Sequence, residues 1–153
     1  MQAYTTQQAF LKIASFCAYQ ERCHQEVREK LHTFALTAEE IEEVISRLIE
    51  ENFLNEQRFA IAYAGGKFRV KDWGKIKIRY ELQQRNISTY CIQKALESID
   101  TEEYYEKLTL LAQKKIAQEQ LRTLQDKQKL YTYLSSKGYE SNLIQEVLRD
   151  CGL

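Results

Sequence analysis

Residues 74–96, GKIKIRYELQQRNISTYCIQKAL, decide the fold. Ile78 and Leu82 lie four residues apart, which is the spacing of one helical face. The step of five from Leu82 to Ile87 breaks the helical period, so we expect a turn there. Helical spacing returns at Ile92, Ala95 and Leu96. The stretch therefore predicts a helix, a short turn and a second helix.

The same pattern of apolar residues occurs three times, with a period near 51 residues. Leu82 is matched by Leu31 and Leu134, and we expect these three leucines to be equivalent buried anchors. Self-similarity at such a period indicates a repeat architecture. The other matched positions, in the order of the three copies, are Val27, Ile78 and Leu130; Leu36, Ile87 and Tyr139; Ile41, Ile92 and Ile144; Val44, Ala95 and Val147; Ile45, Leu96 and Leu148.

A further helix is predicted before each helix pair. Its apolar residues are Phe10, Ile13, Ala14 and Cys17 in the first copy, Phe59, Ala62 and Tyr63 in the second, and Tyr104, Leu108, Leu111 and Ala112 in the third. Residue types suited to helix ends occur at matched places. The expected caps are Asn55 and Asp100 for these first helices, Cys23, Gly74 and Asp126 for the second helices, Thr37 (with Glu40), Ser88 and Glu140 for the third, and Asn86 and Gly138 at turns.

The predicted fold is all-α, with three tandem three-helix repeats at residues 1–54, 55–100 and 101–153. One such unit buries little apolar area alone, so neighbouring repeats must stack into an elongated array that can curve. A compact bundle is the alternative. A long coiled coil fits less well, because the apolar spacing is interrupted every dozen residues.

The composition supports a helical protein that is not secreted. Among 153 residues there is no proline and only five glycines, which leaves few residues for the turns of a β-sandwich or barrel. We expect no membrane span and no signal peptide, because the apolar runs are short and residues 1–20 are polar at their start. Cys17, Cys23, Cys91 and Cys151 have no paired spacing, so we expect reduced thiols in a cytoplasmic protein.

The net charge is zero, but it is unevenly distributed. Residues 1–54 hold five Lys or Arg against nine Asp or Glu, residues 55–100 hold nine against five, and residues 101–153 hold eight of each. The strongest positive charge lies between residues 67 and 85, where Phe68, Trp73 and Tyr80 are interleaved. We interpret it as a basic face that binds a partner, made of Lys67, Arg69, Lys71, Lys75, Lys77, Arg79 and Arg85.

The pattern of this basic face fits phosphates and stacked bases, or an acidic protein groove. The simpler alternative is a solvated helix face with Trp73 packed under its turn. If one helix continues through residues 71–79, then Lys71, Lys75 and Arg79 share one side of it. The glutamates of residues 37–51 are a second candidate docking surface, although a solvated face explains most of them.

Enzyme and metal-site patterns are missing from the sequence. There is no phosphate loop, dinucleotide fingerprint, HExxH or GxSxG motif, so we do not expect an enzyme. His24 and His32 are the only histidines, and they form no close ligand pair with Cys17 or Cys23. We therefore expect neither a metal nor a cofactor.

Several stretches within residues 9–150 resemble the RecX family of regulators. Residues 52–60, NFLNEQRFA, resemble a family signature that ends in Arg-Phe-Ala, here including Arg58 and Phe59. Residues 74–87 are similar to the family motif G-x-x-(R/K)-I-x-x-E-L-x-x-(K/R)-G-(I/V). The matching residues are Gly74, Ile78, Glu81 and Leu82, with Asn86 in place of the second glycine. Residues 22–31 also resemble a family motif, with Cys23 in place of serine, and residues 134–139 fit more loosely.

The resemblance implies a helical regulator that acts on the RecA recombinase. Family members lie in the groove of the RecA filament on single-stranded DNA and restrain filament extension, ATP hydrolysis, strand exchange and repressor cleavage. They are cytoplasmic and are not enzymes. We expect a monomer. Direct DNA binding is expected to be weak, because the net charge of the chain is zero. The rival hypotheses are a helical module that binds nucleic acid without RecA and a scaffold for another protein.

Overall fold

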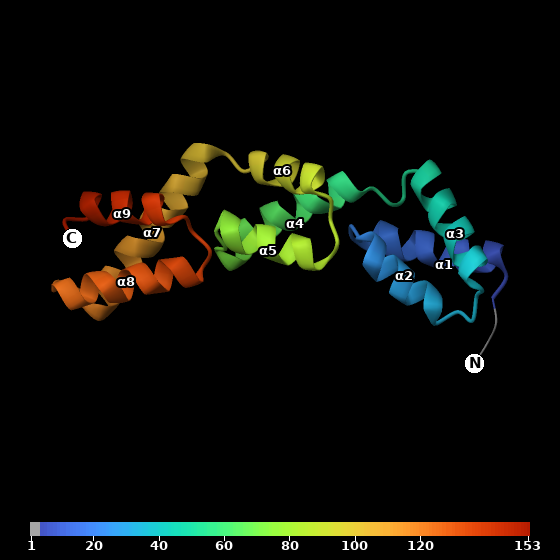
Figure 1. Ribbon diagram of the computed structural model, residues 1–153, viewed down its shortest axis with the longest axis horizontal. Coiled ribbons are helices and arrows are strands. Elements are labelled where there is room, and N and C mark those ends of the chain that lie inside the picture. Colours follow the sequence, from blue (N-terminus) through green and yellow to red (C-terminus); the bar gives the residue numbers. More distant parts are fainter. Residues whose placement is uncertain (1–3) are drawn as a thin grey trace.

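The computed structural model describes residues 4–153 as a row of helices without strands (Figure 1). The first three residues of the predicted first repeat lie outside the described residues. The helices come in three consecutive sets of three, so the predicted all-α repeat fold is confirmed. Their bounds are α1 Thr6–Tyr19, α2 His24–His32, α3 Ala38–Glu50, α4 Glu56–Lys71, α5 Lys75–Gln84, α6 Thr89–Glu97, α7 Thr101–Glu119, α8 Leu124–Ser136 and α9 Ser141–Asp150.

Most helices begin where the sequence predicts. Asn55 and Asp100 accept hydrogen bonds from the backbone N–H groups of Arg58 and Glu103 at the starts of α4 and α7. The expected cap of α8 is wrong. Thr123 caps this helix, and Asp126 lies one turn inside it, where its carboxylate accepts from the N–H of Thr123. Helix α8 is therefore three residues longer at its start than the repeat implies.

The turn between the second and third helix uses a left-handed residue in every repeat. Asn86 and Gly138 have φ angles of 59° and 100°, as expected for the residue types that tolerate this conformation. Ala35 takes the matched place in the first repeat with φ of 56°. Alanine is strained in this region, so the first repeat has a turn residue poorly suited to its backbone.

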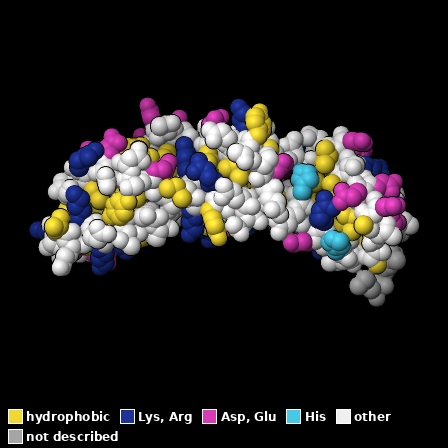
Figure 2. Space-filling model, in the orientation of Figure 1, with side chains coloured by type: hydrophobic (Ala, Val, Ile, Leu, Met, Phe, Trp, Pro, Cys, Tyr) yellow, Lys and Arg dark blue, Asp and Glu magenta, His cyan; other side chains and the backbone are white. Residues whose placement is uncertain are grey.

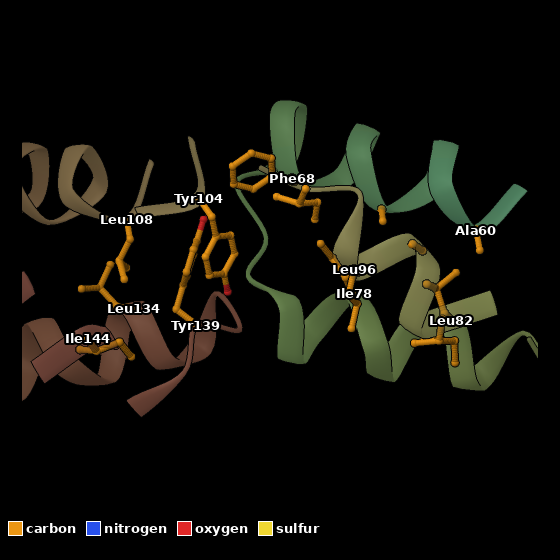
Figure 3. Packing of buried hydrophobic residues seen from close by; sticks show 14 of the residues in the cluster. Ala60, Phe68, Ile78, Leu82, Leu96, Tyr104, Leu108, Leu134, Tyr139 and Ile144 are labelled. Carbon is orange, nitrogen blue, oxygen red and sulfur yellow. The ribbon is translucent and has the colours of Figure 1, made fainter. Parts of the chain in front are cut away.

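The repeat anchors lie at the centre of the packing. Leu31, Leu82 and Leu134 are fully buried, as predicted, and Figure 3 shows two of them facing the neighbouring helices of their repeats. The predicted core face of α4 is partly wrong. Phe59 is buried as predicted, but Ala62 is exposed and Tyr63 only half-buried. The other buried side chains of this helix are Ala60, Ala64 and Phe68.

The buried apolar residues form two separate clusters. One is made only of residues from the first repeat and its exit, between Ala9 and Leu54. The other joins the second and third repeats into one core that runs from Phe59 to Leu148. Cys23, at the start of α2, is the one described first-repeat residue whose buried side chain belongs to this second cluster. The first repeat therefore has its own core, while the other two share one.

Backbone hydrogen bonds join the second and third repeats in addition to their shared core. The N–H groups of Gly74 and Ile76 at the start of α5 donate to the carbonyl oxygens of Lys137 and Gly138, at 2.8 and 2.9 Å. The N–H of Lys75 donates to the Tyr104 hydroxyl at 2.8 Å. The turn between α8 and α9 thus satisfies the first donors of α5, which a helix cannot satisfy by itself.

None of the helices within residues 4–153 is both long and apolar enough to cross a bilayer. The predicted boundaries of the three repeats, at residues 1–54, 55–100 and 101–153, stay a prediction.

Candidate partner-binding surface

The seven predicted basic residues do not lie on one helix. Helix α4 ends at Lys71, Asp72 takes a left-handed conformation with φ of 61°, and α5 begins at Lys75. No single helix continues through residues 71–79, so Lys71, Lys75 and Arg79 do not share one helix face. These three residues are four apart in the sequence, but the chain turns at Asp72, between Lys71 and Lys75.

Three of the basic residues surround two aromatic rings. The rings of Tyr63 on α4 and Trp73 in the turn lie edge to face, with centroids 6.4 Å apart. The Lys67 ammonium lies 5.4 Å from the Tyr63 centroid and 5.0 Å from that of Trp73. Lys77 lies 4.8 Å from Trp73, and Arg85 lies 4.8 Å from Tyr63. We call these five residues the aromatic–basic cluster, which is stabilised by cation–π attraction.

A fourth basic residue, Lys71, lies beside this cluster along an open groove. The groove follows one side of α4 and has a volume of about 620 Å³. Its other wall comes from the first repeat. The lining residues are Gln20, Glu21, Glu26, Phe59, Ala62, Tyr63, Gly66, Lys67, Val70, Lys71 and Arg85.

The remaining three predicted basic residues lie elsewhere. Lys75 is at the seam with the third repeat, with its ammonium 4.9 Å from the Tyr104 ring. Arg69 is on another side of α4, where its guanidinium lies beside Gly65 and lines a separate depression. Arg79 is exposed on α5. The structure thus brings four of the seven predicted residues together and separates three.

The family-motif residues have structural roles. Phe59, Ile78 and Leu82 are buried in the shared core. Glu81 pairs with Arg85 at 3.3 Å, one turn further along, and so helps to hold that guanidinium over the Tyr63 ring.

Arg58 connects α4 to the first repeat. Its guanidinium pairs with Glu21 after α1, and it also donates to the carbonyl oxygens of Asn52 and Phe53 at 3.0 and 3.3 Å. This single side chain therefore holds the linker between α3 and α4 against two other segments. Hydrogen bonds from a charged donor are among the stronger ones in proteins, so Arg58 contributes to the position of the first repeat.

Sequence reasoning missed two parts of this surface. Tyr63 was not included among the interleaved aromatic residues, although it precedes Lys67 by four residues on the same helix. The Glu21 and Glu26 wall had no signal in the sequence, because it depends on how two repeats stack. Conversely, Phe68 is buried and not part of the surface.

The charge of the surface changes along the molecule. Figure 2 shows acidic side chains gathered over the N-terminal end, and basic ones over the middle and the C-terminal end. Helix α3 has five glutamates against Arg47, whereas α5 has three basic residues against Glu81. Burial raises the pKa of the Tyr63 hydroxyl above its ordinary value. In residues 4–153 no group of histidine, cysteine or acidic side chains is arranged to hold a metal ion.

Comparisons with known proteins match this architecture. Residues 55–96 match the family model described as RecX, second three-helix domain, and residues 102–148 match RecX, third three-helix domain. The chain is 35% identical over 134 residues to a protein of Clostridium botulinum (strain Eklund 17B / Type B) named Regulatory protein RecX, covering 84% of this chain and 61% of the relative. It is 32% identical over 145 residues to the Regulatory protein RecX of Bacillus cytotoxicus, covering 94% and 54%. The chain thus spans between half and two thirds of the length of these relatives.

Solved structures share the fold. The crystal structure of RecX from Lactobacillus salivarius superposes with a TM-score of 0.86 at 22% identity, covering 95% of this chain and 96% of that one. A second crystal structure, of regulatory protein RecX, has a TM-score of 0.83 at 21% identity and covers 95% and 72%. At these identities the agreement concerns the arrangement of the helices.

Proposed function

The chain belongs to the RecX family of regulatory proteins, and from this premise we propose that it binds the RecA recombinase in its filament on single-stranded DNA. Bound there, it restrains filament extension, and with it ATP hydrolysis, strand exchange and repressor cleavage. The working surface is the basic middle of the array. The protein acts as a monomer in the cytoplasm, without a cofactor and without chemistry of its own.

The observation that carries this proposal is an elongated helical array in which only the middle repeat has a net positive charge. An elongated molecule can follow the groove of a helical filament over several subunits. The middle repeat then has its basic residues nearest the acidic side chains and the DNA backbone of such a groove. Charge complementarity of this kind favours encounter and orientation.

Direct nucleic-acid binding without RecA is the second candidate. The concentration of cations on the second repeat favours it. Two observations weigh against it as the main activity. The whole chain has no net positive charge, and cations already lie over the rings of Tyr63 and Trp73 that would otherwise stack on bases.

Co-sedimentation separates the two candidates. The protein is mixed with RecA–DNA filaments and, separately, with the same single-stranded DNA alone, over a series of salt concentrations. We expect it to sediment with filaments and to bind bare DNA weakly. Strong binding to bare DNA with a steep dependence on salt would instead mean many phosphate contacts.

A charge-reversed variant tests the surface. Lys67→Glu with Lys71→Glu is expected to weaken filament binding. The matched control is Lys114→Glu with Arg122→Glu, which makes the same charge change on exposed residues of the third repeat. Equal binding by the two variants would show that the groove side of α4 is only a solvated surface.

A further inference from the structure

The groove beside α4 has the shape and lining of a docking site for a peptide. Its volume of about 620 Å³ is enough for several side chains. Along its floor, Ala62 and Val70 are exposed, and Val70 has 76% of its surface accessible. Phe59 and Tyr63 continue this apolar floor towards the start of the helix. A helix face with apolar residues at this spacing suits a partner that lays an apolar side into it.

The charges around the floor are unequal. Glu21 and Glu26 on the first-repeat wall are each paired with an arginine, Arg58 and Arg22 respectively. On the opposite side, Lys67 and Lys71 have no carboxylate within ion-pair distance among residues 4–153. The groove therefore has two unmatched positive charges beside an apolar floor, and its negative charges are already neutralised.

Gly66 lies in the middle of the floor and leaves it open. Glycine in a helix interior costs about 1 kcal/mol relative to alanine. A Cβ at this position would meet no atom within 4 Å, so packing inside this chain does not require the glycine. Its neighbour Gly65 differs, since a Cβ there would meet the Arg69 guanidinium at 2.7 Å. The absence of a side chain at Gly66 preserves space above α4.

We propose that this groove docks an acidic amphipathic segment of a protein partner, with apolar side chains over Gly66 and Val70 and carboxylates on Lys67 and Lys71. A nucleic acid fits less well. The centre of the floor, at Ala62 and Val70, is aliphatic and offers no ring on which a base could stack, and the neighbouring faces of Tyr63 and Trp73 are covered by cations. The inference rests on the proposed function only for the identity of the partner, the filament protein. Because the segment touches both the first repeat and α4, its binding also fixes the position of the first repeat.

The chemistry is tested without RecA. The probe is a fluorescently labelled synthetic helix of about four turns, with leucine on one face and glutamate on the other. Its anisotropy is titrated with the full chain, and a second probe has lysine in place of glutamate. We expect saturable binding of the glutamate probe only. Trp73, the single tryptophan, should change its fluorescence on binding, because Lys67 lies over its ring.

Gly66→Leu fills the groove without loss of a buried contact, and leucine is the better helix former. We expect this variant to remain folded and to bind the glutamate probe at least tenfold more weakly. Gly66→Ala, a much smaller addition, is the matched control and should bind nearly as the parent does. Equal binding by Gly66→Leu and the parent, equal binding of the two probes, or no binding of the glutamate probe would each overturn the inference.

Filament co-sedimentation of Gly66→Leu distinguishes this failure from failure of the proposed function. If the parent chain sediments with RecA filaments and Gly66→Leu does so equally, the groove inference is wrong and the proposed function stands. If the parent does not sediment but binds the glutamate probe, the groove stands and RecA is the wrong partner.

Discussion

Replacing Gly74 by alanine is expected to weaken the contact between the second repeat and the third. The backbone of Gly74 has φ of −81°, which alanine adopts without strain, so any effect must come from the added Cβ. That Cβ would lie 2.4 Å from the carbonyl carbon and oxygen of Gly138 and 2.5 Å from the nitrogen of Tyr139. These are backbone atoms of the turn between α8 and α9, which cannot move aside as a flexible side chain does.

The cost follows from the hydrogen bonds that the displaced turn would break. The N–H groups of Gly74 and Ile76 would lose the carbonyl oxygens of Lys137 and Gly138. Gly74 is buried, and a buried donor left without a partner costs about 1–3 kcal/mol, whereas Ile76 is exposed and water can replace its lost bond; the predicted loss is therefore roughly 1–3 kcal/mol. Since small proteins have only about 5–15 kcal/mol of stability, a loss of this size is readily measured.

Urea unfolding followed by circular dichroism at 222 nm measures the loss. Gly66→Ala is the matched control, because it is the same substitution at a place where the Cβ meets nothing within 4 Å. We expect the control to be more stable than the parent by about 0.5–1 kcal/mol. A Gly74→Ala variant as stable as the parent would refute the role given to this seam.

Four further expectations concern the repeats. Leu82→Ala, at a fully buried anchor, should lower the free energy of unfolding by about 2–5 kcal/mol in urea titration, and a Leu82→Asp variant with an unchanged melting temperature would contradict the repeat alignment. Ala35→Gly should raise the melting temperature, because relief of left-handed strain of about 1–2 kcal/mol exceeds the added entropy of the unfolded chain, about 0.4–1 kcal/mol; no gain would mean that the turn is unstrained. A fragment of residues 55–153 should fold and unfold cooperatively by itself, since it contains almost all of the shared core, whereas a disordered fragment would show that the predicted boundary at residue 55 is wrong. Burial raises the pKa of the Cys17 thiol from its ordinary 9.0 to about 11, so the folded state holds the proton more tightly and stability should fall between pH 9 and 11; Cys17→Ala should show a shallower fall over this range, and an equal slope would contradict the burial argument.

The repeat and its core were predictable from the sequence because they depend on local spacing. Leu31, Leu82 and Leu134 repeat with the same apolar neighbours, and a helical period makes those neighbours one face. Caps such as Asn55 were equally visible. The start of α8 was not, since Thr123 and Asp126 are both competent cap residues and the repeat favoured the second.

The candidate surface was only partly predictable. The sequence identified the basic residues but not their separation, because one left-handed residue, Asp72, turns the chain between Lys71 and Lys75. The groove beside α4 depends on the stacking of two repeats that have separate cores. No local sequence pattern in either repeat predicts that contact.

The rate of RecA filament extension on single-stranded DNA tests the central claim most directly. It is followed by single-filament fluorescence microscopy with and without the purified chain. We predict that extension slows as the chain is added, in parallel with a fall in DNA-dependent ATP hydrolysis, and that Lys67→Glu with Lys71→Glu weakens both effects. Unchanged extension and hydrolysis at a saturating concentration of the chain would contradict the claim.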